Sequence, residues 1–190
     1  VEPFPGPQSV ILFGHAGIAR DDPDFLAAFI ANEVLGGGRF SARLMTEVRE
    51  RRGLTYGIHS ALSAGDLAQT LTGRVQTGNA TVAETVAVIR SEWARIATEG
   101  ISPEELEATQ IYLTGSFPLR FDGNGQIARV LAGFQAQGYP ADYAITRNDR
   151  VMAVTVEDVR RAAARLFRPE ALHFVVVGSP EGLETDGQGQ

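Results

Sequence analysis

The chain has 190 residues, 44% of them hydrophobic, and a net charge of -6. Since none of its residues is cysteine, disulfide frameworks and thiolate zinc sites are excluded. The acidic balance argues against binding to nucleic acid, which requires clustered basic side chains, and no apolar run approaches the roughly 20 residues that span a bilayer.

The first residues, VEPFPGPQ, are rich in proline, which is typical of a linker, so we expect the chain to begin inside a longer protein. They lack the basic start and the apolar core of a signal peptide. An apolar run at residues 10–13 predicts a buried strand. From residue 21, two acidic residues, a proline and apolar residues at helical spacing predict a helix that ends at Gly36.

A second helix, with Phe40, Leu44 and Val48 on one face, is predicted to stop at Gly53, since glycine is common at helix C-termini. Strand alternation begins at Tyr56 and continues to residue 62.

The next predicted strand has an apolar face, with Leu67, Leu71 and Val75, and a polar face of threonine, arginine and glutamine. Because one face is polar, the pattern indicates an antiparallel sheet with one side in water.

Helical patterns dominate the second half of the chain. Capping residues predict three helix starts, at Thr81 with Glu84, at Ser102 with Glu105, and at Thr155 with Asp158. The first of these helices is long and has an apolar stripe formed by Val82, Val86, Ile89, Trp93 and Ile96. The second of these helices runs toward residue 118 and the third ends near residue 167, while residues 125–137 form a weaker helical pattern. Residues 172–177 contain three successive valines and predict a central strand that is covered on both faces.

Strands at both ends with helices between them predict a single α+β domain, with a mostly antiparallel sheet and helices packed on one of its faces. We expect this domain to cover residues 1–183. The polar, glycine-rich end at residues 184–190 predicts a disordered tail.

The glycine run at Gly36, Gly37 and Gly38 does not match a nucleotide-binding loop. A phosphate-binding P-loop needs Lys and Ser or Thr after its glycines, but arginine and phenylalanine follow here. A dinucleotide fingerprint would follow a strand, whereas a helix precedes this run. The simplest interpretation is that the glycines supply the positive φ angles of a sharp helix-to-helix connection.

No metal-binding or nucleophile motif is present in the sequence. His15, His59 and His173 are scattered, and no His-x-x-Glu-His helix or Gly-x-Ser-x-Gly elbow exists. Each histidine is interpreted as a strand residue whose ring makes hydrogen bonds. The chain alone therefore holds no complete catalytic apparatus.

Arg49 and Tyr56 flank the predicted helix-to-strand turn at Gly53. Reversal of the chain there can bring the guanidinium and the phenol to the same rim, where they could hold a peptide carbonyl or stabilise an oxyanion formed at a metal elsewhere. The alternative is a surface arginine that favours the helix dipole and a tyrosine that packs on the sheet.

Four segments of the chain carry a family resemblance. In chain order they are GHAGIARDDPDFLAAFIANEVLGGGRFSARLMTEVRERRGLTYGIHS, ISPEELEATQIYLTGSFPLRFD, AVTVEDVRRAAARLF and VVVGSPEGL. Together they closely resemble the C-terminal, non-catalytic domain of the pitrilysin or insulinase-like (M16) zinc metallopeptidases. That group includes mitochondrial processing peptidase. The resemblance covers residues 8–183, and the family's opening strand is either missing here or falls within residues 1–7. In the family, two homologous domains form a clamshell, and only one of them carries an inverted His-x-x-Glu-His zinc site.

The resemblance implies roles for the residues singled out above. Arg49 and Tyr56 match an arginine and a tyrosine seven positions apart that reach the partner's zinc site and hold the scissile peptide. The segment Gly36 to Gly38 matches a glycine-rich segment associated with substrate handling. The resemblance also implies that this chain holds no metal and is inactive alone. The Zn²⁺ ion would lie in a homologous His-x-x-Glu-His-bearing domain or subunit. The ligand of this chain would be a peptide or an unfolded polypeptide.

Two alternatives of other classes stay open at this point. The same fold serves as a structural or scaffolding subunit in respiratory-complex core proteins, although the intact Arg49 and Tyr56 pair favours the peptidase. A peptide-binding module acting alone is less favoured, because half a cavity leaves its ligand open to solvent. For the compartment, the resemblance suggests the bacterial periplasm or cytoplasm.

Overall fold

The computed structural model describes residues 1–183, so the tail predicted at residues 184–190 lies outside the described part of the chain. Five strands form one sheet in the order β1-β5-β2-β4-β3. Only the β1 and β5 pair is parallel, and the other neighbours are antiparallel. The strands are β1 Glu2–Pro3, β2 Gln8–Ala16, β3 Ile58–Ala64, β4 Gln69–Gly78 and β5 His173–Gly178.

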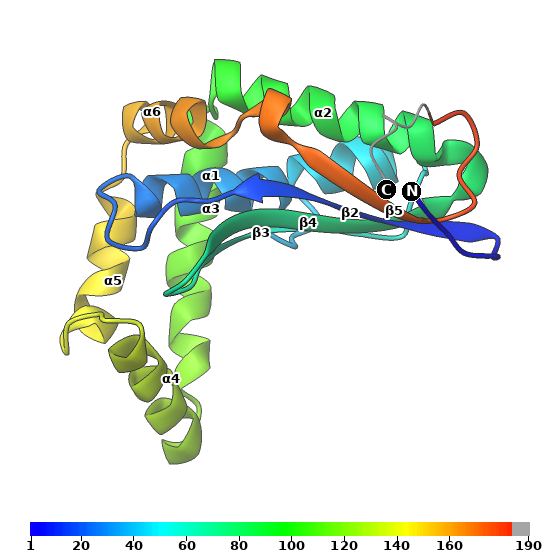
Figure 1. Cartoon of the computed structure of the whole chain (residues 1–190). Helices are drawn as coiled ribbons and strands as arrows, with labels where there is room; N and C mark the ends of the chain where they lie inside the picture. Colours follow the sequence, from blue (N-terminus) through cyan, green and yellow to red (C-terminus); the bar gives the residue numbers. More distant parts are fainter. Residues whose placement is uncertain (184–190) are drawn as a thin grey trace.

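Helices α1, α2 and α6 cover one face of this sheet (Figure 1), which confirms the predicted α+β architecture with helices on one side. The helices are α1 Phe25–Gly36, α2 Val82–Glu99, α3 Pro103–Ser116, α4 Asn124–Ala136, α5 Tyr143–Met152 and α6 Val156–Leu166. A π-helical segment, Met45–Glu50, follows α1, and short 3₁₀ turns lie at Asn79–Thr81, Phe117–Phe121 and Pro169–Ala171.

The core lies between the sheet and the helices, and Trp93 of α2 is fully buried at its centre. Its ring meets Phe13 of β2 edge-on with centroids 5.7 Å apart, and Phe167 after α6 at 5.3 Å. The predicted stripe along α2 is therefore the one that packs on the sheet.

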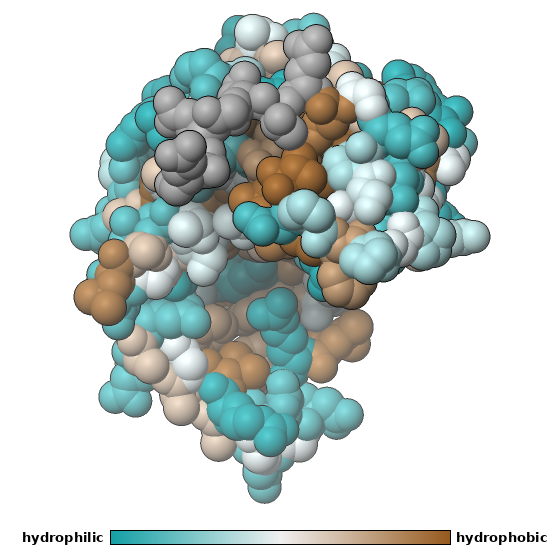
Figure 2. Space-filling view, turned by 45° about the vertical axis from the view of Figure 1, so that its right-hand side comes forward, coloured by the Kyte–Doolittle hydropathy of each residue, from teal (hydrophilic) through white to brown (hydrophobic). Residues whose placement is uncertain are grey.

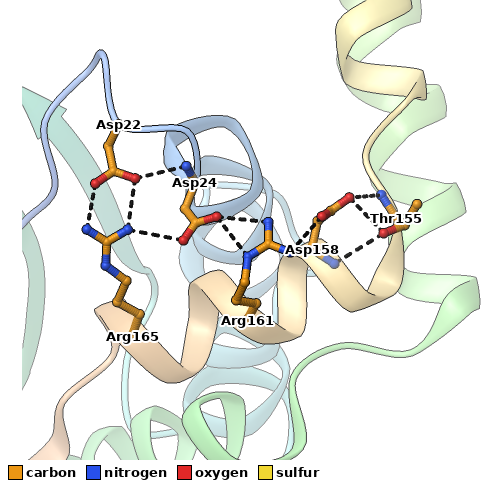
Figure 3. A network of polar contacts seen from close by, with 6 residues as sticks. All are labelled: Asp22, Asp24, Thr155, Asp158, Arg161 and Arg165. Carbon is orange, nitrogen blue, oxygen red and sulfur yellow. Dashed lines mark hydrogen bonds and ion pairs between the residues drawn. The ribbon is translucent and has the colours of Figure 1, made fainter.

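A network of charged side chains joins α6 to the loop before α1 (Figure 3). Asp24 is almost fully buried, and its carboxylate accepts hydrogen bonds from Arg161 at 2.9 Å and from Arg165 at 3.1 Å. Arg165 also donates to Asp22 at 2.6 Å. The network thus joins two segments that are distant in the sequence, since Asp24 and Arg165 are 141 positions apart.

Helix starts were predicted with mixed success. Capping boxes form at Ser102 with Glu105 and at Thr155 with Asp158, as expected. The box predicted at Thr81 is wrong, because the Thr81 hydroxyl donates instead to the carbonyl of Gly78 at 2.9 Å. Helix α5 has no counterpart among the sequence predictions.

Three strand and helix boundaries also differ from the predictions. The second helix was predicted from Phe40, but Phe40 lies in the connection before it and is 67% exposed. Leu67 does not belong to the apolar face of β4, because it lies in the preceding turn and is fully exposed. Strand β5 is not covered on both faces, since Val175 is 49% exposed on the open side of the sheet.

Residues 117–152, here called the arm, extend from α3 and carry α4 and α5 away from the layers formed by the sheet and its covering helices (Figure 1). No residue of α4 is buried. Arg20 ties the arm to the body, because its guanidinium donates to Gln137 Oε1 at 3.0 Å and to the carbonyl of Ala64 at the end of β3. The arm and the body together enclose a concave side of the molecule.

Candidate functional site

Each of the three glycines at the C-terminal end of α1 is explained by a different feature of the structure. A Cβ at Gly36 would overlap the hydroxyl of Ser60, which itself donates to Asn32 at 2.7 Å, so glycine lets α1 approach β3. A Cβ at Gly37 would collide with Glu33 one turn earlier. Gly38 alone has a positive φ, of 81°. The interpretation as a positive-φ connection therefore holds for only one of the three.

Arg49 lies in the last turn of the π-helical segment, and its guanidinium carbon is 5.0 Å from the centroid of the Phe40 ring. Within residues 1–183 it has no ion pair. Glu47, two positions earlier in the same segment, is bound by Arg51 at 2.8 Å and by Arg52 at 2.7 Å. The hydrogen bond from Arg52 lowers the pKa of Glu47 in spite of its burial. Arg49 thus has no acidic partner among the described residues, and its guanidinium lies over an aromatic ring.

Tyr56 was predicted to begin a strand, but it lies two residues before β3. Its side chain is 91% exposed. Packing on the sheet, the alternative interpretation, is therefore wrong. Hydrogen bonds hold the backbone around it: Thr55 Oγ1 donates to the carbonyl of Gln76 at 2.7 Å and accepts from the amide of Gly57 at 3.1 Å. A backbone held by hydrogen bonds thus presents the phenol to solvent.

The turn between the two residues is closed by the backbone. Gly53, with a φ of 64°, donates its amide hydrogen to the carbonyl of Arg49 at 3.0 Å, and Leu54 donates to Val48 at 3.0 Å. Among the described residues, the Arg49 side chain contacts the Phe40 ring and makes no hydrogen bond to Tyr56. That the two residues serve one rim remains a prediction.

Phe40 is the residue of this site that sequence reasoning missed. Its pattern was that of a helix stripe, yet the ring is exposed and lies under Arg49. A large apolar side chain two residues after a glycine run was the only signal, because no helix can continue through Gly38 at positive φ.

Zinc does not fit the described residues. Residues 1–183 contain no group of three His, Cys, Asp or Glu side chains that could hold a metal ion. His15 is used in the core, where its Nε2 lies 2.9 Å from the indole nitrogen of Trp93. His59 and His173 line a shallow apolar depression of about 480 Å³ on the open face of the sheet.

Helices of the described chain are also too short or too polar to cross a bilayer.

A family model described as "Peptidase M16 inactive domain" matches residues 1–113. Among curated proteins, the chain is 29% identical to an uncharacterized zinc protease of Streptomyces coelicolor over 161 residues, 82% of this chain and 34% of that protein. It is 24% identical to a non-peptidase homolog of Helicobacter pylori over 173 residues, 90% of this chain and 40% of the relative.

The solved structures agree with the observed fold. A peptidase M16 inactive domain from Pseudomonas fluorescens superposes with a TM-score of 0.86 at 29% identity, over 97% of this chain and 43% of that chain. A Bordetella pertussis structure superposes with a TM-score of 0.75 at 18% identity, over 93% of this chain and 95% of that chain, and so shows the same fold in a chain of similar length. The present chain spans 34% and 40% of the length of the two curated relatives named above.

Proposed function

The chain belongs to the peptidase M16 inactive-domain family, and we propose that it positions a peptide against the catalytic site of a homologous partner, on the same polypeptide or on another chain. The partner would carry the His-x-x-Glu-His motif and the Zn²⁺ ion, and hydrolysis would be its chemistry. This chain would contribute binding and orientation of the substrate, and would be inactive alone.

One observation carries the proposal. Tyr56 exposes 91% of its surface from a turn whose backbone is fixed, although a large aromatic side chain in solvent contributes nothing to the core. A phenol held in this way can donate a hydrogen bond to an oxyanion that develops on a substrate carbonyl.

Arg49 supports the same role by its charge. Because Arg49 has no ion pair within residues 1–183, its guanidinium is available to carbonyl oxygens of a peptide backbone. Its planar donor groups suit two parallel hydrogen bonds, and the ring of Phe40 limits its freedom before substrate arrives.

The experiment is peptide hydrolysis by this chain combined with its His-x-x-Glu-His-bearing partner. Tyr56→Phe is expected to lower kcat about 100-fold, the effect typical of removing one oxyanion donor, while the Michaelis constant changes little. Arg49→Ala is expected to lower kcat and also to raise the Michaelis constant, because Arg49 would hold the substrate before the reaction begins. Arg160→Ala is the matched control, since it removes an exposed arginine of α6, outside this turn.

A scaffolding role is the second candidate, and the non-peptidase homolog of Helicobacter pylori is the observation that favours it. It predicts that the assembly forms with full stability and that no peptide is cleaved. Unchanged hydrolysis in both Tyr56→Phe and Arg49→Ala would remove the site assignment, whereas an assembly without hydrolysis in the wild type would favour the scaffold.

A further inference from the structure

A cavity of about 610 Å³ lies where the arm meets the body, between α1, the end of β3 and α3. Figure 2 shows the molecule hollowed between these two parts. The cavity is within the size range of ligand sites. Aromatic rings from both parts line it: Phe25, Phe29, Phe117, Phe134, Tyr139 and Tyr143.

Three arginines of the arm line the cavity without an acidic partner. Arg120, Arg147 and Arg150 form no ion pair within residues 1–183. Arg147 lies over the ring of Phe117 at 4.4 Å and donates to the neutral carbonyl of Leu113 at 3.1 Å. Burial lowers the pKa of Arg147, and the charge of Arg120 adds to this effect. These three arginines therefore have no ion pair among the described residues, while neutral groups hold Arg147 in place.

The two acids that line the cavity do not balance these charges. Asp22 is bound by Arg165 at 2.6 Å, and this hydrogen bond lowers its pKa. Burial raises the pKa of Glu33, although Arg39, Arg120 and Arg147 oppose the shift. Glu33 therefore holds its negative charge less readily than an exposed glutamate does. The cavity has more guanidinium than carboxylate charge.

The cavity also adjoins the glycine-rich segment. Gly37 lines it, and so does Tyr112 of α3, whose ring centroid lies 4.9 Å from the guanidinium carbon of Arg39. A guanidinium binds a carboxylate through two parallel hydrogen bonds, and aromatic walls suit the apolar neighbours of that carboxylate.

We propose that this cavity holds an aspartate or glutamate side chain of the bound peptide, with an adjacent apolar side chain against the aromatic wall. The chain would accordingly select acidic, aromatic-containing segments. This inference rests on the proposed function only in taking a peptide as the ligand, and it requires neither Arg49 nor Tyr56.

The test measures binding of two peptides to the 190-residue chain by isothermal titration calorimetry. Both are capped at each end, so that every carboxylate belongs to a side chain: acetyl-Gly-Glu-Phe-Glu-Gly-amide and its analogue with Gln in place of Glu. The Glu peptide is expected to bind at least about tenfold more tightly, as one charge-assisted hydrogen bond would provide. Equal affinity of the two peptides, or no binding of either, would overturn the inference.

Variants locate the site. Arg120→Ala combined with Arg150→Ala is expected to weaken binding of the Glu peptide about tenfold or more, with little effect on the Gln peptide. Arg129→Ala is the matched control, because Arg129 lies on α4 outside the cavity and donates to Gln126 Oε1 at 2.6 Å. An equal loss in this control would show unspecific attraction of charge and would contradict the proposal.

Two further measurements distinguish the cavity from a general anion site and from the site at Arg49 and Tyr56. Inorganic phosphate at millimolar concentration is expected not to displace the Glu peptide; displacement would identify a general anion site and contradict the proposal. Arg49→Ala combined with Tyr56→Phe is expected to leave the preference for the Glu peptide over the Gln peptide unchanged, because these residues would contact the backbone that both peptides share. The cavity assignment can therefore fail while the proposed function stands, and the reverse is equally possible.

Discussion

The indole nitrogen of Trp93 lies 2.9 Å from Nε2 of His15, at the centre of the core, and the other ring nitrogen of His15 lies 2.8 Å from the carbonyl oxygen of Ala16. The indole can only donate, so Nε2 accepts and Nδ1 carries the proton. The geometry therefore requires a neutral imidazole. The protein uses this histidine to complete the core and not to bind a metal.

This pair predicts a loss of stability in mild acid. Burial lowers the pKa of His15 below its ordinary value of about 6.5, and Arg168 and His173 act in the same direction while Glu170 opposes them. The unfolded chain therefore binds the proton more readily. The contribution of His15 to the free energy of unfolding is fully present above about pH 6.5 and falls as the pH drops below that value.

Urea unfolding at pH 7 and pH 5 checks this prediction. The wild type is expected to lose more stability between the two pH values than His15→Gln does. His59→Gln, which changes an exposed histidine, should retain the wild-type difference. If His15→Gln showed the same pH dependence as the wild type, the neutral imidazole would not be the cause.

The charged network around Asp24 predicts a second effect on stability. Asp24→Asn is expected to lower the free energy of unfolding by about 2 kcal/mol, because two arginines lose their shared acceptor and the buried amide cannot replace it. Glu157→Gln on the exposed side of α6 should change it by less than about 0.5 kcal/mol. Chemical denaturation of the two variants provides the measurement, and equal losses would show that the network contributes no specific stabilisation.

The glycines predict opposite effects of the same substitution. Gly36→Ala is expected to destabilise the fold by about 1–3 kcal/mol, since the new methyl group overlaps Ser60. Gly133→Ala should stabilise it by about 0.5–1 kcal/mol, because this position lies inside α4 with nothing within 4 Å of a new Cβ. Thermal unfolding curves would distinguish them, and a tolerated Gly36→Ala would contradict the close approach of α1 to β3.

Phe40 predicts a graded effect on the proposed site. Phe40→Leu removes the aromatic face beneath Arg49 but keeps an apolar side chain, so the partner-dependent hydrolysis rate is expected to fall by about twofold to fivefold, the value of an exposed cation–π contact of about 0.5–1 kcal/mol. Arg49→Ala should cost more. Because Phe40 is 67% exposed, the free energy of unfolding should hardly change. A Phe40→Leu variant with wild-type kinetics would show that Arg49 needs no platform.

Local patterns predicted much of this molecule. The long stripe of α2 and the capping boxes at Ser102 and Thr155 depend on residues three or four positions apart, and these interactions form wherever the segment lies. The boundaries near the candidate site were predicted less well. Tyr56 alternates with Ile58 in sequence, but Thr55 bonds to Gln76 of β4 and holds the chain in a turn up to that point.

The sequence by itself determined the α+β class and the polar outward face of β4, because periodicity depends only on neighbours along the chain. Only the tertiary structure decided that Arg161 and Arg165 pair with Asp24, which lies 137 and 141 positions away in the sequence. It alone also brought Gly37 and the arginines of the arm around one cavity. Charge pairing and cavity shape depend on which distant segments pack together, and no local pattern records that choice.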